Sequence, residues 1–179
     1  RRAQMFITGP SVIEQVTGEK VTPDDLGGPD AQMSKAGNIH LVAEDDAQAI
    51  ALCRRLLSFL PSNNLEDPPA VAGDYSVAYD ESLNSIIPDE AKRGYNVKDV
   101  IARIVDAGDF LEIQETFAAN AVVGFGRICG HAVGIVANQP MVMAGSLDIN
   151  ASDKIARFVR FCDAFNIPLL TLVDVPGFL

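Results

Sequence analysis

Polar side chains come at the ends of two apolar runs in the second half of the sequence. Asn138 and Gln139 end one run, and Asp174 ends another. α/β folds bind ligands at the carboxyl ends of their strands, so these positions are the first candidates for a site. The two amides either close a turn or line a pocket. The loop after Asp174 is either a turn built on Pro176-Gly177 or a segment that offers a carboxylate and backbone N–H groups to a ligand.

The other residues with catalytic potential form no pattern of their own. His40 and His131 are the only histidines, and neither belongs to a metal-binding spacing. We interpret both as structural, with His131 exposed in a turn. The cysteines, Cys53, Cys129 and Cys162, are odd in number and form no CxxC pair, which argues against a disulfide scaffold or a zinc site. Cys53 and Cys162 lie on apolar helical faces and are expected to be buried free thiols.

Glycine-rich motifs for nucleotides are also missing. Gly124-Phe125-Gly126 with Gly130 resembles a dinucleotide fingerprint, but its spacing is off by one residue and a strand follows it. We interpret these as hairpin glycines. The sequence contains neither a P-loop nor a G-x-S-x-G nucleophile motif, so neither a phosphate-cradling loop nor the simplest hydrolase is indicated.

The elements that must position the candidate site fall into two parts. In the first, residues 5–10 resemble a strand end, and the S-x-x-E spacing at Ser11 predicts a short helix. A Gly/Pro/Asp-rich loop is expected at 23–37, followed by a short strand at 39–42. Apolar residues at three-to-four spacing predict an amphipathic helix over 44–60. Pro61 stops that helix and opens a polar, proline-rich linker that runs to about Asp80.

The second part reads as an α/β or ββα unit. The pattern predicts a helix over 97–107, an antiparallel hairpin made of 120–128 and 132–137, and a helix over 152–165 capped by Asn150 or Ser152. The apolar run 169–173 predicts a strand that is buried on both faces.

Composition excludes several classes of protein. The 179 residues carry 24 Asp and Glu against 14 Lys and Arg, a formal net charge of −10, and 48% are hydrophobic. Such a chain is expected to fold as a globular domain, and its acidity disfavours nucleic acid and anionic membrane surfaces as partners. No apolar run is long enough for a transmembrane helix, and Arg1-Arg2 does not open a signal peptide. We therefore expect no direct membrane insertion, and the cysteines without a disulfide pattern favour a bacterial cytoplasmic or mitochondrial matrix location.

Several motifs together, in their order along the chain, carry a family resemblance. They are Met5-Phe6-Ile7-Thr8-Gly9-Pro10, Val16-Thr17-Gly18-Glu19, Leu26-Gly27-Gly28, Leu57-Ser58-Phe59-Leu60-Pro61-Ser62-Asn63-Asn64, Pro68-Pro69, Val123-Gly124-Phe125-Gly126-Arg127, Val133-Gly134-Ile135-Val136-Ala137-Asn138-Gln139-Pro140, the segment 157–168, and Asp174-Val175-Pro176-Gly177-Phe178. The set resembles the carboxyltransferase (β) subunits of biotin-dependent acyl-CoA carboxylases. It is most similar to the propionyl-CoA carboxylase and methylmalonyl-CoA carboxyltransferase type, and it covers nearly the whole chain.

This resemblance implies a crotonase-like (ClpP/crotonase) α/β fold made of two homologous halves. Residues 1–60 would be the tail of the N-terminal, acyl-CoA-binding half, 61–80 the linker, and 81–179 the start of the C-terminal, carboxybiotin-binding half. The implied enzyme moves a carboxyl group from carboxybiotin to the α-carbon of an acyl-CoA through a thioester enolate. Biotin would be carried by a partner, a biotin carboxyl carrier or biotin carboxylase subunit, and the enzyme would be a dimer-built homo-oligomer such as a hexamer.

The family stabilises its two oxyanions with backbone N–H groups in glycine-rich loops, so no metal and no side-chain nucleophile is implied. Those loops would lie upstream of Met5 and downstream of Leu179, so the 179 residues alone are expected to be inactive. The resemblance implies no catalytic side chain here, but it implies a lining for the carboxybiotin pocket: Asn138, Gln139, Pro140, Asp174, Pro176, Gly177 and Phe178.

The chain departs from the family in one loop. The family often has His-x-His and then Ser-Gly-x-x-His after Leu-Gly-Gly, whereas this sequence has Asp30, Gln32 and Ala36 at the first three of these positions. Gly37 and His40 match the pattern. Two alternatives to the carboxylase stay open: a biotin-dependent acyl-CoA decarboxylase subunit of the same fold, and a structural piece without activity.

Overall fold

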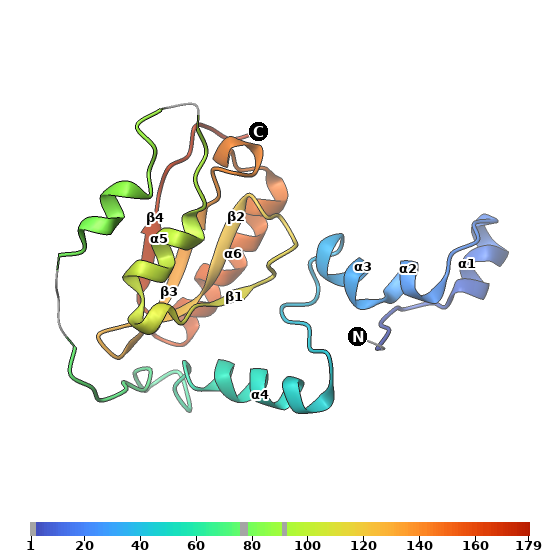
Figure 1. Ribbon diagram of the computed structural model, residues 1–179. Coiled ribbons are helices and arrows are strands. Elements are labelled where there is room, and N and C mark those ends of the chain that lie inside the picture. Colours follow the sequence, from blue (N-terminus) through green and yellow to red (C-terminus); the bar gives the residue numbers. More distant parts are fainter. Residues whose placement is uncertain (1–2, 76–78, 91–92) are drawn as a thin grey trace.

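The computed structural model describes residues 3–75, 79–90 and 93–179 (Figure 1). A four-stranded sheet forms the centre of the body, with strands in the order β1-β2-β3-β4. The helices α1 to α3 form an arm that extends away from this body, and α4 joins the arm to it (Figure 1). The helices are α1 (Pro10–Thr17), α2 (Pro23–Gly27), α3 (Pro29–Ser34), α4 (Asp46–Leu57), α5 (Val97–Ile104) and α6 (Ile149–Ala164), and the strands are β1 (Leu111–Ile113), β2 (Ala121–Ile128), β3 (His131–Asn138) and β4 (Leu169–Leu172).

The arm differs from the sequence-based expectation. α1 begins at Pro10, with Gly9 as its N-cap, so Ser11 does not form a capping box. The loop expected over 23–37 contains two short helices, each with a proline at its first turn. Proline is favourable there because the first helical N–H has no partner in the helix, so the same residues that indicate a loop also start a helix. Segment 5–10 forms no strand and is joined to α2 by one bond, from Met5 N to Gly27 O (2.8 Å).

The expected strand at 39–42 is absent. The segment is tied to the end of β1 by the single backbone bond from Gln114 N to His40 O (2.9 Å), which is too little pairing for a strand. The amphipathic helix is confirmed but shorter, as α4. Its residues Leu52 and Leu56 pack against the main core, whereas Cys53 is exposed, which corrects the expected burial. Only part of the predicted apolar face of α4 therefore packs against the described chain.

The predicted hairpin is confirmed, and the sheet has one more strand than expected. β2 and β3 pair antiparallel from Ala121↔Asn138 to Ile128↔His131. Gly130 closes their turn with φ of 79°, a conformation that favours glycine. β1, which the sequence analysis missed, pairs antiparallel with β2 on its other side. It is only three residues long, too short for an alternating pattern to identify.

The two faces of the sheet are covered by different elements. On one face, Phe125 and Val123 of β2 pack with Phe158 and Cys162 of α6 and with Phe59, which follows α4. On the other face, the neighbouring strand residues pack with α5. That second cluster contains Val97, Ile101, Val105, Val122, Val133, Ile135 and Ala137. The sheet is therefore the middle layer of three, and the predicted α/β class is confirmed.

α6 is the predicted helix with a different start, and its close packing on β3 requires a glycine. Its N-cap is Asp148, whose carboxylate accepts from Ala151 N (2.9 Å), rather than Asn150 or Ser152. A Cβ added at Gly134 would lie 2.6 Å from the Cys162 sulfur. β4 runs parallel to β3 and is the edge strand of the sheet that the described residues form; it is not buried on both faces, since Leu169 is 40% exposed.

The linker is extended and partly anchored. Phe59 and Pro61, at its start, are buried, and Val71 N bonds to Gly130 O (3.0 Å) at the β2–β3 turn. Residues 76–78 of the predicted linker lie outside the described residues. A 3₁₀ helix at Glu81–Ser85 follows, and α5 ends earlier than expected, with a second 3₁₀ turn at Asp106–Gly108.

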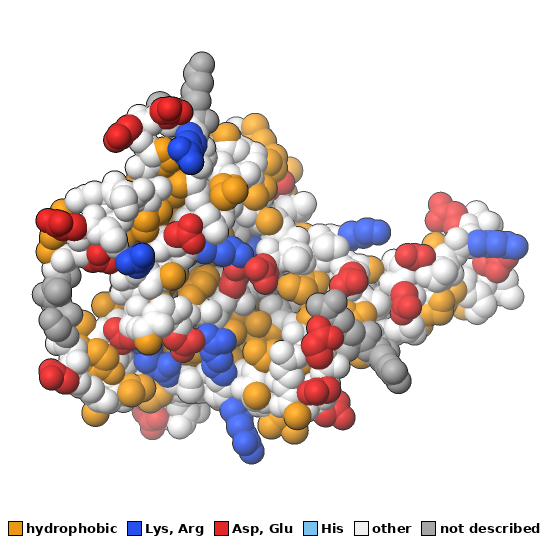
Figure 2. All heavy atoms as spheres, viewed as in Figure 1, with side chains coloured by type: hydrophobic (Ala, Val, Ile, Leu, Met, Phe, Trp, Pro, Cys, Tyr) orange, Lys and Arg blue, Asp and Glu red, His pale blue; other side chains and the backbone are white. Residues whose placement is uncertain are grey.

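Charged side chains of both signs are spread over the visible surface of the body and of the arm (Figure 2). Figure 2 shows acidic side chains spread over the arm, with Lys and Arg at separate places between them. None of the described helices is long and apolar enough to cross a membrane.

Two of the three thiols, those of Cys53 and Cys162, are expected to react at different rates. Burial raises the pKa of the Cys162 thiol to about 12, so almost none of it is the reactive thiolate near neutral pH. Cys53 is exposed on α4. In native protein at pH about 8, iodoacetamide should therefore modify Cys53 well before Cys162. Peptide mass spectrometry checks this order, and unfolding in urea should remove the difference. Equal labelling of both thiols before unfolding would contradict the packing of α6.

Candidate functional site

The two predicted loops meet at one edge of the sheet. β3 and β4 are parallel neighbours, so Asn138 at the end of β3 lies beside Asp174, which follows β4. The Asn138 amide bonds both main-chain groups of Asp174: its Oδ1 accepts from Asp174 N (2.8 Å), and its Nδ2 donates to Asp174 O. Asn138 is 3% exposed. Its side chain is thus engaged in fixing the second loop on the first.

Gln139 is engaged in the same way toward α5. Its Oε1 accepts from Val97 N (3.3 Å), and its Nε2 donates to Asn96 Oδ1 (2.8 Å). It is 6% exposed. Of the two alternatives for these amides, the geometry therefore favours a scaffold role: both close connections, and neither side chain is free to bond a ligand.

The segment 139–148 frames the site and depends on a glycine. Gly145 has φ of 80°, and a Cβ there would lie 2.5 Å from Asn138 Nδ2 and 3.1 Å from Asp174 O. Only glycine combines that conformation with that approach. Asn120 fixes the same segment from the other side, since its O accepts from Gln139 N (2.9 Å) and its Nδ2 donates to Ser146 O (2.9 Å). The sequence analysis singled out neither residue.

The loop after β4 runs along this segment. Leu147 N donates to Gly177 O (3.1 Å), and Leu179 N donates to Leu147 O (2.9 Å), which makes a short parallel bridge. Pro176 is exposed, and Phe178 is 77% exposed. The predicted lining residues are therefore of two kinds. Asn138, Gln139 and the Gly177 carbonyl hold the backbone, whereas Pro140, Asp174, Pro176 and Phe178 have side-chain surface left to contact a ligand.

Tyr95 is a site residue that the sequence analysis missed. Its hydroxyl donates to Asp174 Oδ2 (3.0 Å) from the segment before α5. Burial raises the pKa of Tyr95, and the Asp174 carboxylate raises it further, so the phenol stays a proton donor over the whole neutral range. The site thus holds the exposed carboxylate of Asp174. The Tyr95 phenol sets the direction of this carboxylate, and the Asn138 amide fixes the backbone of Asp174.

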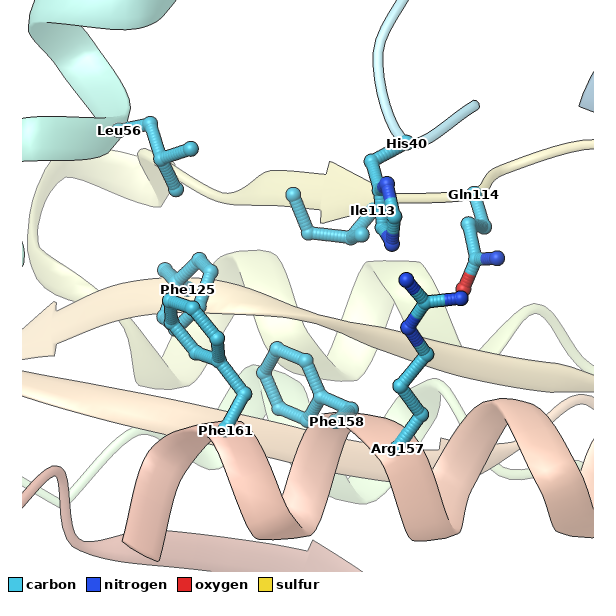
Figure 3. A pocket seen from close by; sticks show the side chains of 8 residues that line it. All are labelled: His40, Leu56, Ile113, Gln114, Phe125, Arg157, Phe158 and Phe161. Carbon is cyan, nitrogen blue, oxygen red and sulfur yellow. The ribbon is translucent and has the colours of Figure 1, made fainter. Parts of the chain in front are cut away.

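A separate cavity lies between α4, β1 and α6 (Figure 3). It has a volume of about 320 Å³, and its walls are mainly apolar side chains. The lining residues are His40, Leu56, Ile113, Gln114, Phe125, Arg157, Phe158 and Phe161. Arg157 points toward Gln114 and His40 at one end (Figure 3). Burial lowers the pKa of His40, as does the nearby Arg157. His40 accepts from Gln114 through its backbone, in keeping with a structural role.

Within residues 3–75, 79–90 and 93–179, no three His, Cys, Asp or Glu side chains are grouped so that they could hold a metal ion. The site at the sheet edge instead offers oxygen acceptors, one phenol and exposed apolar surface, a set suited to an organic ligand with both polar and apolar parts.

Comparison with known proteins places these features in a family context. The model of the carboxyl transferase domain matches residues 1–179. The 12S subunit of methylmalonyl-CoA carboxyltransferase from Propionibacterium freudenreichii subsp. shermanii is 58% identical over 179 residues, which are 100% of this chain and 34% of the relative. The methylmalonyl-CoA decarboxylase subunit alpha of Veillonella parvula is also 58% identical, over 99% of this chain and 35% of its own length. The propionyl-CoA carboxylase beta chain of Saccharopolyspora erythraea is 54% identical, over 99% of this chain and 34% of its own length.

Solved structures agree with the sequence relatives. A crystal structure of transcarboxylase 12S, described as a hexamer assembly with substrate binding to a multienzyme core, matches 99% of this chain and 35% of its own, with a TM-score of 0.97 and 58% identity. A single-chain, multi-domain long-chain acyl-CoA carboxylase matches 98% of this chain and 17% of its own, with a TM-score of 0.81 and 29% identity. The chain spans about a third of the length of the curated relatives described here.

Proposed function

Because this chain belongs to the carboxyl transferase domain family and has the crotonase-like fold that its motifs predicted, we propose that it is part of the carboxyltransferase of a biotin-dependent acyl-CoA carboxylase. The substrate would be a short acyl-CoA of the propionyl type. The observation that carries the proposal is the likeness to transcarboxylase 12S over 99% of the chain at a TM-score of 0.97.

The sheet edge at Asn138 and Asp174 is proposed as the lining of the biotin pocket. Biotin has an apolar bicyclic body and a polar ureido group, so it needs apolar contacts beside fixed polar groups. Pro176 and Phe178 offer exposed apolar surface next to the Asp174 carboxylate. Biotin, when bound, supplies a labile carboxyl group and, once that group has left, a basic ureido nitrogen.

This chain's own residues would bind and orient rather than transfer protons. Asn138 fixes the backbone at Asp174, and Tyr95 fixes the direction of its carboxylate. Such preorganisation matters because a misplacement of about 1 Å can cost about 10²-fold in rate. The backbone N–H groups that stabilise the two oxyanions are proposed, as the resemblance implies, to lie outside these 179 residues.

The decarboxylase alternative has an observation of its own in its favour. The chain is as similar to the methylmalonyl-CoA decarboxylase subunit alpha as to the carboxyltransferase 12S subunit, at 58% each. Both proteins would share the half-reaction between acyl-CoA and biotin. A membrane subunit that copurifies with the full-length protein, together with sodium-dependent release of CO₂, would favour the decarboxylase.

The proposal also defines partners and a compartment. Acyl-CoA would be the substrate, and biotin would arrive on a carrier domain or subunit. A homo-oligomer built from dimers, such as a hexamer, is proposed from the assembly described for transcarboxylase 12S. The compartment would be the bacterial cytoplasm or the mitochondrial matrix.

Isotope exchange tests the proposed function. The full-length protein should transfer ¹⁴C-carboxyl from methylmalonyl-CoA to free biotin, because that half-reaction needs no other subunit. The 179 residues alone should give no exchange, since the implied oxyanion loops are absent from them. Heat-inactivated protein is the control. An active full-length protein with an inactive 179-residue chain is the predicted pair of results, and no exchange by the full-length protein with any acyl-CoA would overturn the proposal.

A further inference from the structure

The Lys154 side chain makes an arrangement that neither the sequence motifs nor the proposed chemistry accounts for. It lies in the first turns of α6, yet it is only 2% exposed. Its ammonium group donates to four backbone carbonyl oxygens: Gln114 (3.0 Å), Phe117 (2.8 Å), Ala118 (3.4 Å) and Ala121 (2.7 Å). An ammonium has three N–H donors, so four acceptors share them. We refer to these four carbonyls as the carbonyl cage.

The carbonyl cage holds a connection with a strained backbone. Gln114 and Ala118, both within the β1–β2 connection, have φ of 55° and 44°. Residues other than glycine reach that region only at a cost, so something must fix them there. The Lys154 ammonium draws three carbonyls of this connection and that of Ala121, the first residue of β2, toward one point. It therefore sets the path of the chain from the end of β1 to the start of β2.

That path leads directly to the candidate site. Asn120 lies between Ala118 and Ala121 of the cage and is 2% exposed. Its carbonyl accepts from Gln139 N (2.9 Å), and its side chain donates to Ser146 O (2.9 Å) and to Asp148 Oδ1 (3.2 Å). Asn120 thus holds both ends of segment 139–148. Within that segment, Gly145 packs against Asn138 Nδ2 and Asp174 O.

From these contacts we infer that Lys154 is a positioning residue for the biotin pocket. It acts through the β1–β2 connection and Asn120 on segment 139–148, and through that segment on the Asp174 loop. Among the described residues, the hydrogen bonds of the Lys154 ammonium go to none of the proposed lining residues. The inference rests on the proposed function for its kinetic consequence, but its structural part, the order of segment 139–148, stands without it.

The charges around Lys154 fit a fixed ammonium. Burial lowers the pKa of Lys154 to about 8; Glu112 and Glu115 oppose that shift, whereas Lys98 adds to it. Glu112 belongs to β1 and Lys98 to α5, where Lys98 pairs with both Glu112 (2.6 Å) and Glu115 (2.9 Å). Lys98 makes none of the cage contacts but bonds Glu115 of the same connection, so the control lysine is Lys20, whose side chain is 83% exposed between α1 and α2.

The kinetic test compares Lys154→Met with Lys20→Met in the full-length protein. Lys154→Met should lower kcat/KM for free biotin by about tenfold or more, while KM for methylmalonyl-CoA stays within about twofold, because only the biotin pocket loses its support. Lys20→Met should leave both values near wild type. A variant that only weakened the fold would lower both substrates' kcat/KM by the same factor, and that result would overturn the inference.

Hydrogen exchange tests the structural part independently of activity. Amides in segment 139–148 should exchange faster in Lys154→Met than in Lys20→Met, with the two proteins alike in α5. If wild-type protein shows no carboxyl exchange but this difference is present, the proposed function fails and the positioning role stands. If segment 139–148 is equally protected in both variants, the positioning role is wrong.

Chemical rescue of Lys154→Ala and a substitution of Asn120 test the inference if Lys154→Met fails to fold. Lys154→Ala removes the atoms of n-propylammonium, so that ion should restore biotin kcat/KM and the protection of 139–148, whereas tetramethylammonium at equal ionic strength should not. Asn120→Ser leaves the carbonyl cage intact and should give the same biotin-selective loss. Wild-type biotin kinetics in Asn120→Ser, or no rescue by n-propylammonium in a folded Lys154→Ala, would overturn the inference.

Discussion

Asn138→Leu in the full-length protein is expected to reduce carboxyl transfer between acyl-CoA and biotin by about 100-fold or more. Leucine has nearly the shape of asparagine but neither donates nor accepts. Asp174 N and O would both lose their hydrogen bonds to the Asn138 side chain, and Asn138 is only 3% exposed. A buried polar group without a hydrogen bond destabilises the fold by about 1–3 kcal/mol. The Asp174 loop should therefore move away from its position.

The measurement is the isotope exchange between methylmalonyl-CoA and biotin, with the oligomeric state checked on the same sample. Asn84→Leu is the matched control, because Asn84 is exposed in a 3₁₀ helix and its amide bonds only the Tyr79 hydroxyl among the described contacts (2.8 Å). That variant should exchange at the wild-type rate. If the assembled Asn138→Leu variant exchanged carboxyl at the wild-type rate, the hydrogen bonds from Asn138 to Asp174 would have no part in the site.

Phe158→Ala is expected to lower the free energy of unfolding by about 3–5 kcal/mol. Phe158 is 5% exposed on α6, and its ring centroid lies 5.0 Å from that of Phe125 on β2. Phe125 in turn stacks on Phe59, 5.7 Å away, so the three rings join α6, the sheet and the end of α4. Phe158 also lines the cavity of about 320 Å³, so its loss enlarges a space that is already unfilled by the described chain.

Equilibrium unfolding in urea gives this value, with Phe178→Ala as the control. Phe178 is 77% exposed after β4, so its truncation should change the free energy by less than about 0.5 kcal/mol. Similar losses for both variants would mean that the aromatic cluster is not the centre of the core.

Elements with a long, regular pattern could be predicted from the sequence. The hairpin of β2 and β3 and the helix α6 follow from β-branched runs and from apolar residues at three-to-four spacing. The errors lie where a local rule competes with packing. Pro23 and Pro29 indicate a loop but start helices, and the apolar run of β4 indicates full burial although the strand lies at the edge of the sheet that the described residues form.

The candidate site shows a similar division. Asn138 and Asp174 could be found because each ends a strand, and their contact follows from the parallel pairing of β3 and β4. That the amides hold the scaffold could not be known, because a side chain's partner is set by tertiary structure. Tyr95 is 79 residues from Asp174 in the sequence.

One missed residue did leave a signal in the sequence. Lys154 lies four residues before Phe158 on the stripe that also contains Ala151 and Cys162, so the helical spacing places it on the buried face of α6. A lysine at such a position is either paired or fixed by acceptors. The carbonyl cage satisfies that requirement, but three of its four acceptors come from a connection with no regular pattern.

The central claim is that biotin binds at the sheet edge formed by the ends of β3 and β4. Hydrogen exchange of the full-length protein with a saturating carrier domain tests it most directly, when the biotinylated carrier is compared with the same carrier lacking biotin. The account predicts that biotin adds protection in segments 138–148 and 173–179 and leaves the walls of the cavity between α4, β1 and α6 unchanged. Protection of that cavity alone, or no difference in either segment, would contradict it.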